Sequence, residues 1–570
     1  MLTTMLSIAE ADAQLTAPGA PFEMEEVEIR GTTVRAWTSA QPDLRHVLER
    51  SRRFGDRTFI VFEDERISFA EHHQLVSALA EHLRAAGVEA GDRVAIAMRN
   101  FPEWSVAFWA TTCIGAIAVP LNAWWTGEEL EYGLADSGSS VAVVDEERAE
   151  RIRPHRGALP ALREVLVVRG TAPTGAGERR WADAVPGAPS GLELPAVELR
   201  PDDPATIFYT SGTTGHPKGA LGTHRNICNN PISLLYQRAR TQLRHPDAPT
   251  SAPADPGAPK PQTGALLTVP LFHVTGTHST LVGAVSFGNK LVMMWKWDPE
   301  RALELIERER LTSFGGVPTM VIQLMESPSF RTRDLTSLTS VGYGGAPAPP
   351  DLVRRIEAEF PPVSPGNGYG MTETSSISTY NGGADYLAKP DSVGPPVAVC
   401  DIRIVDDAGV DVPAGGLGEL WVRGPNVVIG YWGKPEATAE TFVDGWVRTG
   451  DIARVDADGF VYIVDRAKDM VIRGGENIYC VEVESVLAAH PAVLEAAVVG
   501  VPHPVLGEEV AAVVQVKAGA SVDEAELQAH VAEHLAAFKV PVRIDVRTDE
   551  LPHSPQGKVQ KRELREQLAG

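Results

Sequence analysis

The sequence predicts an α/β protein with a large N-terminal domain and a small C-terminal domain, and three observations lead to this prediction. Short apolar runs such as VAIAM, VAVVD and VLVV alternate with helical segments, as buried parallel strands do. From residue 401 onward, strands follow one another across tight turns, which indicates a β-rich part. The last hundred or so residues repeat helix and strand patterns over a length that suits a separate domain. We therefore expect domains 1–465 and 466–570.

Local signals place the first elements of the chain. Ser68 and Glu71 have the spacing of a capping box, and apolar residues recur at helical spacing after them, which predicts a helix over 69–86. Further buried strands are predicted at ALLTVPL, KLVMM and SVGYGG. Residues 1–15 lack the basic start of a secretory signal, and we expect them to be frayed.

One uncharged stretch invites a membrane interpretation. Residues 104–127 carry no charged side chain and are long enough to span a bilayer. However, Gly115, Pro120 and Asn122 interrupt the stretch. A buried helix that begins near Pro102, followed by a strand, therefore fits better than a transmembrane segment.

Composition and charge narrow the class of protein. A chain of 570 residues with 43% hydrophobic and 22% charged residues is an ordinary globular protein, too long for one core. Its formal net charge of −23 should repel nucleic acid and anionic membranes, so we expect neither as a partner. Four cysteines that lie far apart indicate neither a disulfide framework nor a zinc site and fit a reducing cytoplasm.

A stretch rich in proline, alanine and aspartate occupies residues 238–263. Such a composition cannot bury enough apolar surface to offset its ordering entropy, so we expect an exposed mobile loop. An inert insertion is the favoured interpretation over a lid, because surface loops lengthen at little cost.

The run YTSGTTGHPKG at residues 209–219 has the composition of a phosphate cradle. Glycines allow a close backbone approach, while hydroxyls, amides and Lys218 offer donors to anionic oxygens. The run is not a nucleotide-binding P-loop, because Lys218 is followed by Gly219 rather than by Ser or Thr. Taken alone, it also fits a surface loop that binds nothing.

Six further motifs follow in order: PLFHVTG, GYGGAP, GYGMTET, RTGD, DRAKDMVIRGGENIY and LPHSPQGKVQKREL. Together with the first run they resemble the adenylate-forming superfamily, which includes acyl-CoA synthetases, firefly-type luciferases and the adenylation domains of peptide synthetases. The resemblance covers residues 50–566. It implies a large domain of stacked α/β sheets with a β-rich subdomain, a small mobile α+β domain, and ATP, Mg²⁺ and coenzyme A as cofactors.

The resemblance also implies roles for individual residues. The ATP-binding residues would be Thr210, Ser211, Gly212, Thr213, Thr214 and Lys218 at the phosphates, Gly344, Gly345, Ala346, Pro347, Gly368 and Tyr369 at the adenine, and Asp451 and Arg466 at the ribose. The catalytic residues would be Lys558, which stabilises charge in the transition state, Thr372, Glu373 and His273, with Glu373 also holding the metal. The hinge would be Lys468, and Arg473, Gly474 and Gly475 would border the coenzyme A tunnel.

Some residues in these motifs also have simple structural interpretations. A lone histidine such as His273 is often a packed core residue, and only the resemblance moves it to the mouth of an acid pocket. Lys561 and Arg562, close to Lys558, are expected to be solvated charges.

The substrate is predicted to be a small-molecule carboxylic acid. By the resemblance, its pocket would be lined by residues 273–276, 317–320, 342–345 and 368. The small residues at 342, 344 and 345 favour an open slot and thus a medium- or long-chain fatty acid, with about 0.8 kcal/mol for each buried methylene. Aromatic or polycyclic acids stay open, because Tyr343 or Trp295 would cap a shorter pocket.

Other functions also stay open. They are an acyl-AMP ligase that loads a carrier protein, a luciferase-like oxygenase and a non-catalytic nucleotide-binding protein. The resemblance leaves open a homodimer. His503 stands where the family usually carries Asp, a departure that does not touch the implied chemistry.

Overall fold

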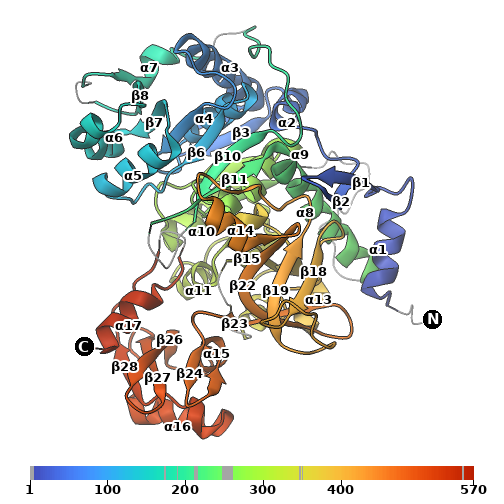
Figure 1. The fold of residues 1–570 in the computed structure, drawn as a ribbon, viewed down its shortest axis with the longest axis vertical. Helices are drawn as coiled ribbons and strands as arrows, with labels where there is room; N and C mark the ends of the chain where they lie inside the picture. The colour runs from blue at the N-terminus through green and yellow to red at the C-terminus, as the bar shows by residue number, and fades with distance from the viewer. Residues whose placement is uncertain are drawn as a thin grey trace.

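The computed structural model describes residues 5–171, 175–188, 191–210, 216–246, 261–345, 348, 351–554 and 557–569. These residues form two eight-stranded sheets, a five-stranded β-rich part and a C-terminal domain with its own five-stranded sheet. Figure 1 shows the C-terminal domain in red, as a separate body below the rest of the molecule. The predicted α/β fold class is confirmed.

The first large sheet is parallel except at one edge. Its order is β20 (Gly430–Tyr431), β11 (Gly219–Thr223), β10 (Pro204–Tyr209), β6 (Ile117–Pro120), β5 (Arg93–Ala97), β7 (Val141–Asp145), β8 (Glu164–Val168) and β9 (Glu178–Arg180). Helices α5 (Gly127–Ser137), α6 (Glu146–Ile152) and α7 (Trp181–Ala184) accompany these strands. The strands predicted at VAIAM, VAVVD and VLVV are therefore confirmed as β5, β7 and β8.

The second large sheet carries most of the motif residues. Its order is β17 (Thr379–Gly382), β16 (Ser364–Tyr369), β15 (Ser340–Gly344), β14 (Ser313–Gly316), β12 (Gly264–Leu267), β13 (Lys290–Met293), β3 (Thr58–Phe62) and β4 (Glu65–Ser68). Helices α10 (Pro299–Glu309), α11 (Pro318–Glu326), α12 (Asp351–Glu359) and α13 (Gly383–Ala388) pack on β12, β14, β15 and β16. Since β14, β15 and β16 run parallel, their carboxyl ends meet at one edge, where ligands of open α/β sheets bind.

The core between the two sheets explains the uncharged stretch. Helix α4 (Pro102–Cys113) is buried at every residue except Glu103, and it packs with α2 (Leu44–Ser51) and α3 (Phe69–Ala85). A helix that is buried all round has no polar face. The predicted buried helix and strand are confirmed, and among the described residues no helix is both long and apolar enough to cross a membrane.

The N-terminal segment is ordered, contrary to expectation. Helix α1 (Ile8–Thr16) starts with a capping box between Ser7 and Glu10. It packs on α8 (His224–Arg244), where Arg244 Nη1 donates to the Leu6 carbonyl oxygen at 2.6 Å. The prediction of a frayed terminus is therefore wrong for residues 6–16, because tertiary contacts supply what the local sequence does not.

Helix α8 also corrects the prediction for the proline-rich stretch. The helix runs to Arg244, so residues 238–244 are helical rather than part of a loop. Its last turn is held by the buried pair Arg244 and Asp385, 2.9 Å apart. Residues 247–260 lie outside the described residues, and the prediction of an exposed loop there stays a prediction.

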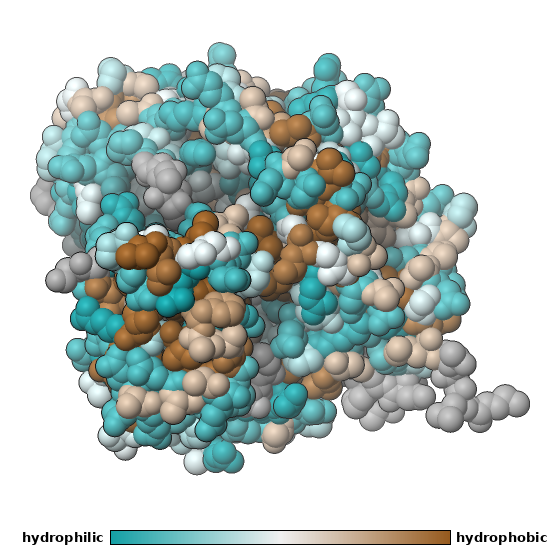
Figure 2. All heavy atoms as spheres, turned by 60° about the horizontal axis from the view of Figure 1, so that its bottom comes forward, coloured by the Kyte–Doolittle hydropathy of each residue, from teal (hydrophilic) through white to brown (hydrophobic). Residues whose placement is uncertain are grey.

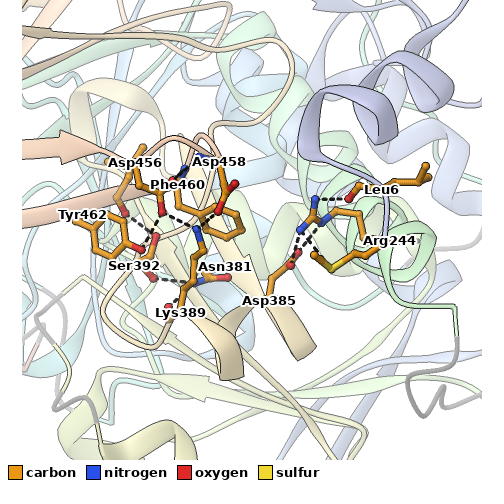
Figure 3. A network of polar contacts seen from close by, with 12 residues as sticks. Leu6, Arg244, Asn381, Asp385, Lys389, Ser392, Asp456, Asp458, Phe460 and Tyr462 are labelled. Carbon is orange, nitrogen blue, oxygen red and sulfur yellow. Dashed lines mark hydrogen bonds and ion pairs between the residues drawn. The ribbon is translucent and has the colours of Figure 1, made fainter. Parts of the chain in front are cut away.

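The β-rich part contains β18 (Asp401–Val405), β19 (Gly418–Arg423), β21 (Phe442–Val443), β22 (Trp446–Val455) and β23 (Val461–Arg466), with α14 (Pro435–Thr441) beside them. Lys389, just after α13, joins this part to the second sheet. Its Nζ donates to Asp456 and to Asp458 at 2.6 Å each and lies 4.3 Å from the Phe460 ring centroid. Figure 3 shows Lys389 reaching into the turn between β22 and β23, with the Arg244–Asp385 pair beside it.

The C-terminal domain has a core of its own. Its strands are β24 (Val471–Arg473), β25 (Glu476–Ile478), β26 (Val493–His503), β27 (Gly507–Val516) and β28 (Arg543–Arg547), and its helices are α15 (Cys480–Ala488), α16 (Glu524–His534) and α17 (Lys561–Ala569). On the face of the molecule shown in Figure 2, hydrophilic side chains dominate and apolar ones gather in separate patches.

Candidate active site

The segment between β28 and α17 carries Lys558 against the carboxyl ends of the second sheet. The segment turns tightly, because Lys558 N donates to Ser554 Oγ at 3.2 Å and Ser554 N donates to the Lys558 carbonyl oxygen at 2.7 Å. Gly557 has a φ of +79°, and a Cβ there would lie 2.6 Å from Val317 of the large domain. On the other side, a Cβ at Gly345 would lie 4.0 Å from Lys558 Cε. Lack of space requires glycine at 557, whereas at 345 it is the φ of +77° that favours glycine.

Charges of both signs surround the Lys558 ammonium. Burial lowers the pKa of Lys558 to about 8, and Arg466 and Lys468 add to the decrease, while Asp451 and Glu373 oppose it. A lysine brought into such a setting retains a proton at neutral pH but holds it less firmly than a surface lysine. The lysine therefore lies close enough to Asp451 and Glu373 of the large domain to interact with both carboxylates.

Asp451 and Arg466 face each other across β22 and β23, where they are register partners. Asp451 Oδ1 lies 3.0 Å from Arg466 Nε, and Asp451 Oδ2 accepts a hydrogen bond from the Tyr369 hydroxyl at 2.6 Å. Burial works against the charge of Arg466, but Asp451 and Tyr369 outweigh it and raise the pKa of the guanidinium. The three side chains thus form one hydrogen-bonded unit at the end of β16.

Glu373 lies in the short helix η4 (Thr372–Thr374) and is buried. Its Oε1 accepts a hydrogen bond from the Tyr431 hydroxyl at 2.6 Å, and Lys218 Nζ lies 4.9 Å from the centroid of the same tyrosine ring. Burial, and then Glu373, raise the pKa of Tyr431, so its hydroxyl stays protonated and donates. Tyr431 was not predicted from the sequence. Nothing in the run GYW at residues 430–432 indicates that its tyrosine contacts Glu373, 58 residues earlier in the chain.

The backbone around Glu373 is strained. Ser375 and Ser376 have φ values of +49° and +98°, in a range of backbone angles that residues other than glycine rarely adopt. A Cβ at Gly370 would lie 1.4 Å from the Ser376 carbonyl oxygen, so glycine is required there. Asn426 Nδ2 donates to the carbonyl oxygens of Thr374 and Ile377 at 3.2 Å and holds the loop in this form.

His273 lies just before the π-helix η3 (Thr275–Leu281), an element that is frequent at functional sites. Its Nδ1 accepts a hydrogen bond from Thr275 N at 3.2 Å. Burial lowers the pKa of His273 to about 3, and Lys558 and His278 contribute. The imidazole is therefore neutral at pH 7 and lies close enough to Lys558 to feel its charge.

A glycine floor lines the same face of three neighbouring strands. Gly315, Gly342 and Gly366 are register partners across β14, β15 and β16, and Gly344 pairs with Gly368. Residues directly opposite one another point to the same face. A Cβ at Gly342 would find only one backbone oxygen, at 3.7 Å, whereas one at Gly344 would lie 2.4 Å from the Gly368 carbonyl oxygen. The floor is thus open at Gly342, whereas at Gly344 it is in close contact with the backbone of Gly368.

Neither predicted cap closes this floor. Tyr343 points to the opposite face of β15, where its hydroxyl hydrogen-bonds Tyr386 at 2.6 Å inside the core. Trp295 is 50% exposed and lines a surface hollow of about 340 Å³ together with Asp145 and Arg169. The suggestion that either residue caps a short pocket is therefore wrong.

The structure places the remaining predicted residues as follows. Thr210 N donates to the Lys218 carbonyl oxygen at 2.9 Å, which closes the base of the glycine-rich run. The other residues of the two loops, Ser211, Gly212, Thr213, Thr214, Ala346 and Pro347, lie outside the described residues. Arg473 pairs with Glu509 at 3.1 Å, and Gly474 N donates to the Leu506 carbonyl oxygen at 2.8 Å, so these contacts remain within the C-terminal domain.

One expectation near Lys558 is corrected. Lys561 Nζ lies 2.7 Å from Glu484 Oε1, and both side chains are largely buried. Lys561 is therefore not a solvated charge. It forms a structural ion pair with Glu484 that holds the start of α17. Arg562 is solvated as expected, with 78% of its side chain exposed.

The structure is that of a two-domain protein with a buried lysine between its domains, and its class follows from comparison with known proteins. The AMP-binding enzyme family model matches residues 47–432, and the model of the AMP-binding enzyme C-terminal domain matches residues 482–558.

Curated proteins and solved structures are similar over nearly the whole chain. The feruloyl-CoA synthase of an Amycolatopsis species is 39% identical over 88% of this chain and 93% of its own. The long-chain-fatty-acid–CoA ligase FadD13 of Mycobacterium tuberculosis is 33% identical over 89% and 94%. The crystal structure of the anthranilate CoA ligase AuaEII with anthranoyl-AMP superposes with a TM-score of 0.82, at 29% identity over 92% and 97% of the two chains.

The chain therefore belongs to the AMP-binding enzymes, in the acyl-CoA synthetase branch of the adenylate-forming superfamily. It is an ATP-dependent acid–thiol ligase of the AMP-forming kind.

Proposed function

We propose that this ligase activates an aromatic carboxylic acid as its acyl-adenylate and transfers the acyl group to coenzyme A. In the first step a carboxylate oxygen attacks the α-phosphorus of ATP, the bond to the bridging oxygen breaks, and pyrophosphate leaves. In the second step the thiol sulfur attacks the acyl carbon, AMP leaves and the thiol proton is released. The observation that carries the proposal is the buried Lys558 ammonium between Gly345, Glu373 and Asp451.

Lys558 would act on the first step. Negative charge grows on the oxygens around the α-phosphorus in the transition state, and a pre-positioned ammonium stabilises it without reorganisation. Thr372, one residue before Glu373, would donate to an α-phosphate oxygen. Neutral His273 would border the acid. Because its ring is uncharged, it would not compete with Lys558 for the substrate carboxylate.

The nucleotide would be held by the groups around Lys558. The Asp451 carboxylate offers acceptors to two ribose hydroxyls, and Arg466 keeps that carboxylate oriented. The Tyr369 ring would cover the adenine, with residues 344–347 opposite. Lys218 and residues 210–214 would bind the β- and γ-phosphates.

Glu373 suits a magnesium ion. It is buried and ionisable, and its Oε1 is held by Tyr431 while Oε2 hydrogen-bonds none of the described residues. Mg²⁺ prefers such oxygen ligands and usually binds through one or two carboxylates plus substrate phosphates. When bound, the ion would supply positive charge to the phosphate oxygens.

The second step would use another face of the C-terminal domain, with Lys468 as the hinge. Arg473, Gly474 and Gly475 would then border the pantetheine arm. Ile472 and Val505, next to them, are 51% and 84% exposed. Their exposure supports the proposal, because a rotation of the domain would cover these apolar side chains.

An aromatic acid is favoured for the substrate. The glycine floor is open at Gly342, where a Cβ would meet only one backbone oxygen at 3.7 Å, and such an open bed suits a planar ring. The most similar of the three proteins above is a feruloyl-CoA synthase. A medium- or long-chain fatty acid is the second candidate, because FadD13 is also similar over most of the chain.

The test is the variant Lys558→Ala in an ATP–pyrophosphate exchange assay over a panel of aromatic and aliphatic acids. We expect ATP binding to persist while adenylate formation falls by about 10²–10³. Arg562→Ala is the matched control, since that side chain is exposed. Near-normal exchange by Lys558→Ala would refute the proposed role. Thioester formation with free coenzyme A, compared with a carrier protein, separates the ligase from an acyl-AMP ligase.

A further inference from the structure

Tyr380 on β17 lies across the glycine floor. It is the register partner of Gly368. A Cβ at Gly366 would lie 2.1 Å from the Tyr380 hydroxyl oxygen, and a Cβ at Gly382 would lie 2.5 Å from Tyr380 Cε1. The ring thus rests flat on β16 and β17, and glycine at 366 and 382 is what allows it to do so.

The ring ends where the open part of the floor begins. Gly342 is the register partner of Gly366 on the next strand, and a Cβ there would meet no side chain within 4 Å. Tyr380 therefore forms a side wall beside an open bed. Since Gly366 lies two residues before Gly368, the hydroxyl is about 7 Å farther from the carboxyl end of β16. The carboxyl end of the neighbouring strand β15 leads to Gly345 beside Lys558, so an acid whose carboxylate meets Lys558 would turn its remote part toward the hydroxyl.

The hydroxyl of Tyr380 is not used within the described part of the protein. It hydrogen-bonds none of the described residues, whereas the Tyr343 and Tyr386 hydroxyls on the opposite face bond to each other at 2.6 Å. Burial raises the pKa of Tyr380, against the effect of the Arg238 guanidinium, so the hydroxyl is protonated at neutral pH. A half-buried donor beside an open bed can bind an oxygen of a ligand.

We propose that Tyr380 determines the specificity of the acid pocket. Its ring limits the length of the acid, and its hydroxyl binds an oxygen substituent on the distal part of the acid. The preferred substrate is then a compact aromatic acid with a distal hydroxyl or carbonyl oxygen, rather than an unbranched fatty acid. This inference rests on the proposed function and names the substrate class within it.

The first arm of the test isolates the hydroxyl. Wild type and Tyr380→Phe are compared by kcat/KM for pyrophosphate release with cinnamate and 4-hydroxycinnamate. Loss of one hydrogen bond should reduce the preference for the hydroxylated acid by about 3- to 10-fold. Activity on cinnamate itself should change little.

The second arm isolates the ring. Tyr380→Ala is compared with wild type on hexanoate, octanoate and dodecanoate. The truncation should raise kcat/KM for the longer acids relative to hexanoate, by up to about fourfold for each methylene that becomes buried. Melting temperatures of both variants report on folding, and Tyr380→Phe carries the test if Tyr380→Ala is unstable.

Tyr343→Phe is the matched control, because it removes a buried tyrosine hydroxyl from the opposite face of the sheet. It should leave both selectivity ratios at the wild-type value. The inference is overturned if Tyr380→Phe discriminates between the two cinnamates as wild type does, or if Tyr343→Phe alters the ratios equally. A wild type that activates no acid of either panel would instead refute the proposed function and the inference with it.

Discussion

At the scale of single residues, the site depends on one ammonium whose proton is weakly held. Burial and the neighbouring cations bring the pKa of Lys558 to about 8. The charged form is the one that would stabilise phosphate oxygens. Its loss should therefore be visible within an accessible pH range.

We predict that kcat/KM for adenylate formation falls as pH rises through about 8. The charged form of Lys558 is present below its pKa and lost above it, and kcat/KM reports groups of the free enzyme. In Lys558→Arg the decline should move to higher pH, because a guanidinium does not lose its proton there. An unchanged pH profile in this variant would contradict the assignment.

The Tyr431 hydroxyl is the second residue with a defined effect. Tyr431→Phe leaves Glu373 Oε1 without its 2.6 Å donor. A hydrogen bond to a charged group contributes about 1.5–3 kcal/mol, so we expect the Mg²⁺ concentration for half-maximal exchange to rise about tenfold or more. Tyr462→Phe, whose hydroxyl bonds Asp456 at 3.0 Å, is the control and should not change the Mg²⁺ requirement.

At the scale of elements, β26 joins the Lys558 segment to the large domain. Glu495 of β26 lies 3.0 Å from His553 Nε2 and accepts a hydrogen bond from Thr319 Oγ1 of α11 at 3.3 Å. Leu494 beside it packs on the apolar cluster of the large domain. These contacts connect the two domains in the present arrangement.

We predict that Thr319→Val and Glu495→Ala slow adenylate formation by about 3- to 10-fold, because each removes the hydrogen bond from Thr319 to Glu495. Thioester formation from supplied acyl-adenylate should be unaffected, because a rotated domain no longer makes these contacts. Measuring both half-reactions separates this effect from general instability, which would lower both.

The same contact has a pH dependence. Burial lowers the pKa of His553, but Glu495 and the Leu551 carbonyl outweigh it, so the pKa is raised, with Glu550 also contributing. The pairing is therefore present at low pH and lost as pH rises through the His553 pKa. In His553→Lys, measured by the pH profile of kcat/KM for adenylate formation, the part of the decline that depends on this pairing should disappear, while the decline at about pH 8 that we assign to Lys558 should remain.

At the scale of the whole molecule, the C-terminal domain has its own core. Its contacts with the large domain include Leu494, the Thr319–Glu495 hydrogen bond and the approach of Gly557 to Val317. Such an interface favours relative domain motion. Lys468 lies between the two bodies, just after Arg466 at the end of β23, a usual place for a hinge.

We predict that Lys468→Pro retains pyrophosphate release and loses thioester formation by at least tenfold, because a fixed φ prevents the rotation. The two half-reactions are measured separately, and equal loss of both would count against the domain swing. The homodimer stays open, and the domain boundary at residue 465 stays a prediction.

The sequence by itself determined what depends on neighbours within a few turns. The capping box at Ser68 fixed the start of α3, apolar runs fixed the strands, and motif spacing identified the family. The tertiary structure alone decided which distant side chains meet: Tyr431 with Glu373, Lys561 with Glu484, and Tyr380 over Gly366. The physical reason is that local patterns follow from backbone periodicity, whereas these contacts arise only when packed strands bring together residues far apart in the chain.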